Sequence, residues 1–201
     1  MVKIREYDES DASAMIALVR ELQAGEVELF DRMKPVAEMG QWYIHLLKKK
    51  CAEDEGVILI AEEDGRALGY AVILTRSVED GTGDEIAYDY AYIVDLAVTE
   101  KARRRGIGRM LLEDCERRAR AAGRDDLRIT VLARNGGAHA LYRSLGFDDL
   151  LIDMRKILKL TKTTRSPTCK RAAWPWSRKA LPHPNATAPP TGHDWKRPSP
   201  R

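Results

Sequence analysis

Three consecutive arginines and two glycines within residues 103 to 108 are the part of this sequence best suited to bind a phosphorylated ligand. An apolar, β-branched run at residues 93 to 98 predicts a buried strand before them, and an amphipathic pattern predicts a helix after them. The turn between strand and helix therefore offers free backbone N–H groups at a helix N-terminus. Because Gly106 and Gly108 have no Cβ to block an anion from these groups, the turn predicts a pyrophosphate site.

Two other phosphate-binding motifs are excluded by residue type. A dinucleotide-binding fingerprint requires a third glycine where this chain has Leu111, and a P-loop requires Gly-Lys followed by Ser or Thr, which the sequence lacks. The arginine-glycine turn alone is a weak signal. A strand-like run at residues 127 to 133 follows it, and then a helix-like segment at residues 135 to 147. The two stretches together are more specific than either one.

Together they resemble the GNAT superfamily, the acetyl-coenzyme A dependent N-acetyltransferases. The family pattern joins Arg/Gln-x-x-Gly-x-Gly/Ala to a later Asn, Ala and Leu-Tyr-x-x-x-Gly-Phe. The resemblance implies an α/β (α+β) fold, with a central mixed, mostly antiparallel sheet flanked by helices. The matching residues are Arg103, Gly106, Gly108, Asn135, Ala138, Leu141, Tyr142, Gly146 and Phe147.

The resemblance also implies that acetyl-coenzyme A is the co-substrate and that its acetyl group passes directly to an amine. Tyr142 is then the catalytic residue that protonates the departing thiolate, and a tyrosine of the core is the alternative. Asn135 either contacts the cofactor arm or only caps a helix. The implied cofactor-binding residues are Leu96, Ala97, Val98, Arg103, Arg104, Arg105, Gly106, Ile107, Gly108, Arg109, Asn135 and Tyr142.

The acceptor amine is expected to meet carboxylates. In the family the first two helices and their link overhang the acceptor site, so the acidic connection at residues 25 to 31 supplies substrate-contact candidates by resemblance. The alternative is a solvated loop. The acidic candidates there are Glu26, Glu28 and Asp31, and Asp89 and Tyr92 of the central strand are further substrate-binding candidates.

The sequence does not identify the general base. An alkyl amine is neutral about once in a thousand molecules at pH 7, a handicap near 4 kcal/mol, so a proton acceptor would help. Strand alternation places Tyr92 on one face and Asp89 and Asp95 on the other, if no bulge intervenes. Asp95 is then a structural residue, and Asp84, Glu85 and Asp89 are possible bases acting through water.

Charge favours a cationic acceptor. Residues 1 to 160 hold 25 basic and 30 acidic residues, a net charge of −5, although the cofactor turn is basic. Acids gather where the family binds its acceptor, beside tyrosine rings that could hold an ammonium by cation–π contact. Ordinary solvated charges are the alternative. The tyrosines of this group are Tyr88, Tyr90 and Tyr92.

The elements that position these residues follow from periodicity and turn signals. We expect strands at residues 2 to 7, 57 to 62 and 67 to 74, with Asp64-Gly65 as the hairpin turn, and a long strand ending at residue 98. Helices are expected after Asp8 or Ser10, at residues 35 to 50, 108 to 122 and 135 to 145. A strand from residue 127 and a final strand at residues 151 to 158 complete the order.

Composition divides the chain into residues 1 to 160, a single domain, and residues 161 to 201, a basic tail with eight of the nine prolines, expected to be disordered.

No apolar stretch is long enough to span a membrane, and we expect a cytoplasmic protein. Neither the three cysteines nor His139 has metal-ligand spacing, so no metal is expected. We expect no nucleic-acid partner for the domain and consider a homodimer. A non-catalytic acyl-coenzyme A binding regulatory module is the alternative to an enzyme.

Overall fold

The structure is a computed structural model that describes residues 1–79 and 86–158. The chain divides into two compact units, Met1–Ile152 and Asp153–Arg201. Of the second unit, residues 153–158 are described, and they form neither helix nor strand. The tail at residues 161 to 201 and the two candidate bases Asp84 and Glu85 lie outside the described residues. The domain boundary near residue 160 therefore stays a prediction.

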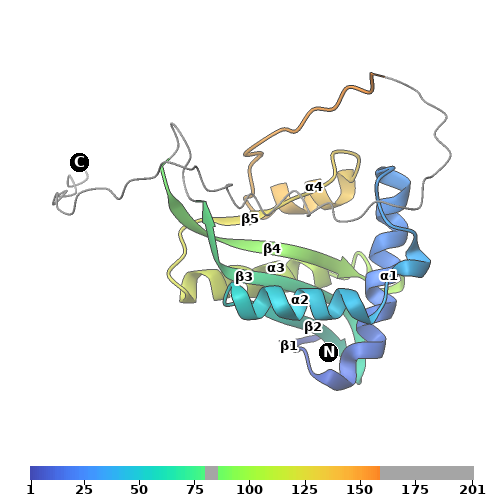
Figure 1. Cartoon of the computed structure of the whole chain (residues 1–201). Coiled ribbons are helices and arrows are strands. Elements are labelled where there is room, and N and C mark those ends of the chain that lie inside the picture. Colours follow the sequence, from blue (N-terminus) through green and yellow to red (C-terminus); the bar gives the residue numbers. More distant parts are fainter. Residues whose placement is uncertain (80–85, 159–201) are drawn as a thin grey trace. The chain divides into compact units, whose positions relative to one another are not determined.

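A five-stranded sheet forms the centre of the first unit (Figure 1). Its strands are β1 (Lys3–Glu6), β2 (Val57–Glu63), β3 (Arg66–Glu79), β4 (Tyr88–Val98) and β5 (Leu127–Ile129), in the spatial order β1-β2-β3-β4-β5. The first three pairings are antiparallel, and β4 pairs with β5 in parallel. The mixed, mostly antiparallel sheet predicted from the sequence is confirmed.

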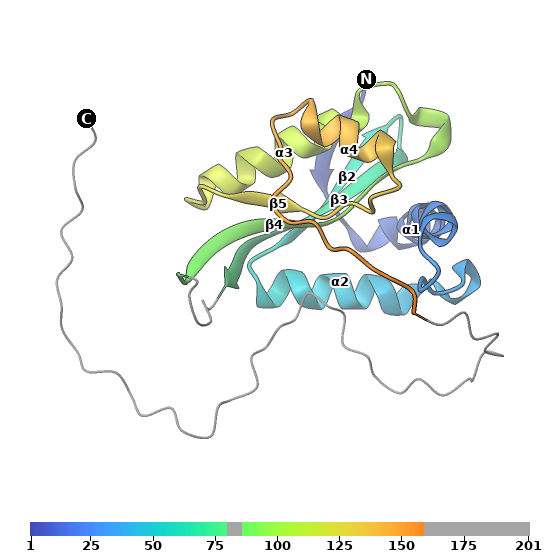
Figure 2. The same cartoon turned by 90° about the horizontal axis from the view of Figure 1, so that it is seen from above.

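Helices cover both faces of this sheet. Figure 2 shows α1 (Ala12–Leu29) and α2 (Gln41–Glu53) on one face and α3 (Ile107–Ala121) on the other, with α4 (Gly136–Arg143) on the α3 side. Within the described residues, three short 3-10 helices complete the order: η1 (Glu9–Asp11), η2 (Val36–Glu38) and η3 (Glu100–Ala102). Because each sheet face is covered, the central strands are buried on both sides.

Strand alternation divides the buried side chains into two clusters. Tyr70 and Val72 of β3 pack toward α1 and α2, against Met15 among others. Ala71 and Ile73, between them in the chain, pack toward α3 and α4. All four of these β3 residues are fully buried. The two layers therefore share one sheet, as the period of two along a strand requires.

A bulge in β4 changes which face its later residues occupy. Ile73 of β3 pairs with Ile93, but Val72 pairs with Asp95, so Val94 is an extra residue in β4. A bulge of this kind reverses the alternation beyond it. Asp95 consequently faces α1 and α2, the same side as Tyr92. The sequence-based placement of Asp95 on the opposite face, which assumed a regular strand, is wrong.

The pairing of β4 with β5 is short. It runs from Ala91 and Leu127 to Ile93 and Ile129, and β5 ends there while β4 continues to Val98. Beyond Ile93 the edge of β4 that faces away from β3 has no neighbouring strand among the described residues. The sheet therefore opens between these two strands, at the point where Val94 bulges.

Four expected elements differ from the structure. Helix α1 continues through Leu29, so most of the expected acidic connection is helical, and Gln23 of α1 holds the true link by donating from Nε2 to the Lys34 carbonyl at 2.6 Å. The second helix starts at Gln41, after η2, instead of at residue 35. Strand β5 is shorter than expected. Residues 151 to 158 form no strand, because no described segment pairs with them.

Turn chemistry was read correctly from the sequence. Asp64 and Gly65 adopt φ of 50° and 74°, as a two-residue hairpin turn requires. Gly123 ends α3 with φ of 72° and Gly146 follows α4 with φ of 88°. The Asn135 side chain caps α4 by accepting from the Ala138 N–H at 3.1 Å.

The contact between β3 and β4 depends on Gly69, and we predict that Gly69→Ala destabilises the fold. A Cβ there would lie 2.6 Å from the Ala97 carbonyl oxygen, a backbone atom of the bulged strand. Overpacking of this kind costs about 1 to 3 kcal/mol. Urea unfolding measures the effect.

Gly25→Ala is the matched control, because a Cβ at this position of α1 meets no atom within 4 Å. It should stabilise the protein by about 0.5 to 1 kcal/mol, since alanine is the better helix former. Equal free energies of unfolding for the two variants would contradict the close approach of β3 to β4.

Candidate active site

The predicted anion site is a turn between η3 and α3. Gly106 precedes the first residue of α3 and has φ of 82°, a conformation that favours glycine. The N–H groups of residues 104 to 106 donate to no backbone carbonyl in the described ranges. The first N–H groups of α3 are free for the reason common to all helix starts. The turn therefore presents the donors that an anion requires.

The arginines of this turn are exposed and have distinct partners. Arg103 donates from Nε to the Val98 carbonyl at 3.1 Å, so it also fixes the end of β4. Arg105 is paired with Glu63 of β2 at 2.6 Å, and Arg109 with Glu113 at 3.9 Å. Arg104 has no ion pair or side-chain hydrogen bond within the part of the chain described. Exposed pairs such as these are weak, so they leave the cations available to an anionic ligand.

The two positions of the turn that carry glycine require it for different structural reasons. A Cβ on Gly106 would meet no atom within 4 Å, so its backbone conformation is what requires glycine. A Cβ on Gly108 would lie 3.1 Å from Leu141 Cδ2, so Gly108 lets α4 approach α3. Gly108 thus sets the position of α4, which carries Tyr142.

Glu21 of α1, which the sequence did not indicate, anchors the same turn. Its carboxylate accepts from the Thr99 hydroxyl at 2.9 Å and from the Glu100 N–H, and it lies 3.6 Å from Arg103. Carboxylates bind N–H groups at helix starts well. The helix that carries Glu26 is therefore tied directly to the predicted anion site.

Residues 96 to 98 lie on the open edge of β4. Their groups on one side pair with β3, where Leu96 is opposite Ala71. The groups on the other side have no strand beside them in the described residues, and the Val98 carbonyl is held by Arg103. An extended ligand could therefore add to this edge through backbone hydrogen bonds.

Tyr142 has a buried ring and a hydroxyl without a partner. The ring, 7% exposed, packs in the α3-side cluster and contacts Phe147 with ring centroids 5.9 Å apart. The hydroxyl makes no hydrogen bond in the described ranges, yet it is not among buried unsatisfied groups, so it reaches solvent. Burial, then the charges of Glu26 and Asp95, raise the pKa of Tyr142 to about 12.

Asp95 is held by two phenols. Tyr43 of α2 and Tyr70 of β3 both donate to its Oδ2, at 2.9 and 3.0 Å. Its Oδ1 accepts no hydrogen bond in the described ranges. Burial raises the pKa of Asp95 to about 6, although the two phenol hydrogen bonds act in the opposite direction.

Glu26 of α1 is a second partly buried carboxylate. It has no ion pair or hydrogen bond within the described residues. Burial raises its pKa to about 7, and the charge of Asp95 adds to the rise. Both carboxylates also raise the pKa of Tyr142, so the three groups lie close enough to interact. The opening between β4 and β5 lets the phenol approach carboxylates that belong to the opposite face.

The remaining acceptor candidates lie elsewhere or are already paired. Asp89 forms an ion pair with Arg124 at 3.0 Å. Arg128 lies over the rings of Tyr88 and Tyr90, 4.6 and 4.3 Å from their centroids, so a cation of the protein already occupies the tyrosine faces. Tyr92 donates to Thr130 at 2.9 Å, Glu28 is exposed on α1, and Asp31 is exposed beyond it.

The structure thus brings together Glu26, Tyr142 and the open edge at residues 96 to 98, and it adds Asp95 with its two phenols. This set can attract a cation, accept a proton and donate one hydrogen bond. Sequence reasoning missed Asp95 as a site residue, although a lone acid inside an apolar strand was the available signal.

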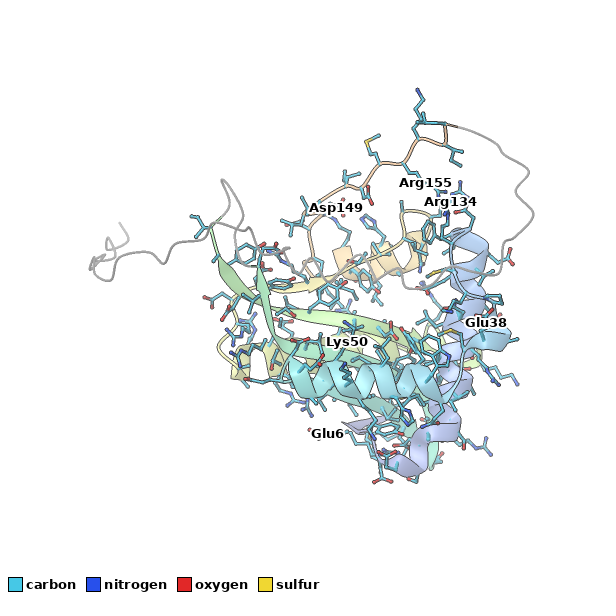
Figure 3. The ribbon with its side chains drawn as sticks, viewed as in Figure 1. Glu6, Glu38, Lys50, Arg134, Asp149 and Arg155 are labelled. Carbon is cyan, nitrogen blue, oxygen red and sulfur yellow. The ribbon has the colours of Figure 1, made fainter. Side chains whose placement is uncertain are left out.

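No group of three or more side chains that could hold a metal ion occurs in residues 1–79 and 86–158. His139 lies 2.7 Å from Asp149, which Figure 3 labels beyond α4. In the same ranges no helix is both long and apolar enough to cross a membrane.

Comparison with known proteins adds independent findings. Residues 19–147 match the family model described as acetyltransferase (GNAT) family. A curated relative, the [ribosomal protein bS18]-alanine N-acetyltransferase of Salmonella typhimurium, is 40% identical over 68 residues, 34% of this chain. The match spans about half of that relative's length, 46%.

Two solved structures show the same fold. A mutant of the BH1408 protein from Bacillus halodurans has a TM-score of 0.70 and 23% identity, covering 78% of this chain and 99% of its own. AAC(6')-Iy, in complex with the bisubstrate analog CoA-S-monomethyl-acetylneamine, has a TM-score of 0.56 and 18% identity, with the same coverage.

The raised pKa of Glu26 predicts a pH dependence of stability. The folded chain binds this proton more tightly than the unfolded chain, whose carboxyl titrates near 4.5, so the free energy of unfolding falls as pH rises from about 4.5 to about 7. After allowance for solvent screening, Glu26→Gln should remove about 1 to 2 kcal/mol of this fall.

Urea unfolding at pH 5 and pH 8 measures it. Glu28→Gln, which removes an exposed charge from the same helix, is the control. If both variants lose as much stability as the wild type between these two pH values, Glu26 is not held in a site that disfavours its charge.

Proposed function

We propose that this chain, which belongs to the acetyltransferase (GNAT) family, moves the acetyl group of acetyl-coenzyme A to a primary amine. The observation that supports it most is the unpartnered phenol of Tyr142 beside two partly buried carboxylates, Asp95 and Glu26, at the opening of the sheet. Neither carboxylate has a cationic partner in the described ranges, although a buried charge without one is costly, so the two suit a cationic ligand better than a purely structural role.

The residues present fit the cofactor. The N–H groups around Gly106 and the cations Arg103, Arg104, Arg105 and Arg109 would hold its phosphates. The open edge of β4 at Leu96, Ala97 and Val98 would bind its extended arm. Asn135 caps α4, which is one of the two roles considered from the sequence, and any contact with the arm stays a proposal. Bound there, acetyl-coenzyme A supplies the acetyl group as a thioester.

The two carboxylates suit an amine that arrives as an ammonium ion. They attract the cation, and one of them takes its proton, which removes part of the handicap near 4 kcal/mol that a protonated alkyl amine carries. Their pKa values are raised to about 6 and about 7, which is closer to the pKa of the amine than the pKa of an ordinary carboxyl is. Asp89 is not the base in this proposal, since its partner is Arg124.

Tyr142 is proposed to assist the leaving thiolate. Its pKa of about 12 keeps the phenol protonated throughout the neutral range. A thiol titrates near 8.5, so complete proton transfer from this phenol would be uphill by about 5 kcal/mol. A hydrogen bond from the phenol to the developing thiolate is therefore the main contribution.

The acceptor class follows from the same charges. We propose a cationic primary amine, which includes amino groups of small molecules, lysine side chains and protein N-termini. The curated relative is named for an alanine of a ribosomal protein, which supports a peptide amine and a cytoplasmic location. The neamine part of the ligand bound to AAC(6')-Iy supports a small cationic amine instead.

An acceptor screen tests the function, with release of free coenzyme A thiol as the readout. We expect kcat/KM to favour cationic over matched neutral and anionic amines, and expect this preference to weaken at high salt. The matched blank is Gly106→Asp, which places a carboxylate at the proposed phosphate site. Binding of acetyl-coenzyme A without thiol release for any amine would favour the non-catalytic regulatory module.

Tyr142→Phe should lower kcat by about 10²-fold or more and leave acetyl-coenzyme A affinity nearly unchanged. The variant removes one hydrogen-bond donor and keeps the ring that packs against Phe147. Single-turnover kinetics and calorimetry measure the two quantities. Full turnover under conditions where chemistry limits the rate would show that Tyr142 is a core residue only.

A further inference from the structure

The groups around Asp95 form an arrangement that the proposed reaction does not by itself require. We propose that Tyr43 and Tyr70 are positioning residues: they bind one carboxylate oxygen of Asp95 and so make Asp95, through its other oxygen, the acceptor of the amine's proton. This inference rests on the proposed function, and it distinguishes Asp95 from Glu26.

The geometry is asymmetric. Both phenols donate to Oδ2 of Asp95, at 2.9 Å from Tyr43 and 3.0 Å from Tyr70, and neither donates to Oδ1. The three residues come from α2 and from the adjacent strands β3 and β4. A carboxylate fixed through one oxygen by two donors cannot rotate, so Oδ1 keeps one direction. Glu26 has no donor in the described ranges that would fix it.

The phenols cannot easily find other partners. Tyr70 is fully buried and Tyr43 is 8% exposed. A buried hydroxyl without an acceptor destabilises the fold, so each phenol is itself held by Asp95. The bulge at Val94 is what turns Asp95 toward them. The sequence thus uses an irregular strand and two buried tyrosines to hold one carboxylate.

In the described ranges, phenols and not cations stabilise the charge of Asp95. The titratable groups that interact with it are Glu26 of α1, Tyr43 of α2, Tyr70 of β3, Tyr92 of β4 and Tyr142 of α4. No lysine, arginine or histidine of the described ranges forms an ion pair with Asp95. The ionised form of Asp95 is therefore stabilised by two hydrogen bonds from phenols instead of by a cation.

The proton balance is simple. The amine binds as an ammonium, Oδ1 of Asp95 takes one of its protons, and the neutral nitrogen forms the new N–C bond to the acetyl carbon while the C–S bond breaks. The thiolate leaves with the electron pair of that bond, beside the Tyr142 hydroxyl, and takes up the second proton, which the acylated nitrogen releases, so the products are the amide and the free thiol. Asp95 returns its proton to solvent before the next turnover.

The test compares Tyr43→Phe and Tyr70→Phe with Tyr90→Phe, a tyrosine whose ring lies against Arg128. Carbon-13 NMR of the labelled protein gives the pKa of Asp95 without any turnover. Loss of one phenol hydrogen bond to a charged acceptor should raise this pKa by about 1 unit, and Tyr90→Phe should leave it unchanged. If Tyr70→Phe fails to fold, Tyr43→Phe gives the same measurement.

The kinetic arm follows kcat/KM for the ammonium form of the best amine against pH. The acid limb should move upward by about 1 unit in the two phenol variants, with about a 5-fold loss at pH 6 and near recovery at pH 9. The acid limb should keep its position in Glu26→Gln. It should disappear in Asp95→Asn, a variant that keeps little activity.

Two results would overturn the inference. One is an unchanged Asp95 pKa in both phenol variants, and the other is an acid limb that follows Glu26 instead of Asp95. The proposed function fails separately, when the wild-type protein releases no thiol with any amine. In that case the NMR titration still decides whether the two tyrosines hold Asp95.

Discussion

One extra residue in β4, Val94, is the constraint on which the site depends. A regular strand would direct Asp95 toward α3, into the mainly apolar cluster on that face of the sheet. With the bulge, Asp95 meets the hydroxyls of Tyr43 and Tyr70 on the other face. The same irregularity begins where β5 stops pairing, so the bend and the open edge of β4 occur at one point. The carboxylate and the backbone edge that would receive the cofactor are thus set by a single feature.

The two halves of the site are connected through α1. Glu21 holds the turn that precedes α3, and Glu26, farther along the same helix, lies beside Asp95. A shift of α1 would therefore move the proposed phosphate site and the acceptor side together. Gly108 gives a second connection, because it sets how closely Leu141, and with it Tyr142, approaches α3. Fixed positions of this kind are what transfer between two bound molecules requires.

The sequence predicted what local rules control. The Asp64-Gly65 turn, the Asn135 cap and the arginine-glycine turn each depend on residues within a few positions, and each is found. Asp95 was misplaced because a bulge arises from the register between two strands, which no local pattern records. Arg124 pairs with Asp89, and Arg128 lies over the rings of Tyr88 and Tyr90. Both arginines follow α3 in the chain, so no local pattern in the sequence showed that these acid and aromatic side chains already have partners.

The free-energy cost of burying two carboxylates without a cation indicates what kind of ligand the site binds. Glu26 and Asp95 are partly buried and have no cation paired with them in the described ranges. Burial disfavours the ionised form of both, and the charge of Asp95 further disfavours that of Glu26. Elsewhere the chain avoids this cost: Asp11 and Glu62 share Arg5, and Asp114 is paired with Arg118. A ligand ammonium would relieve the repulsion that none of the described side chains relieves. The two carboxylates without a cation therefore favour a cationic acceptor more strongly than the net charge of the chain does, because they lie at the proposed reacting centre and their partial burial weakens solvent screening.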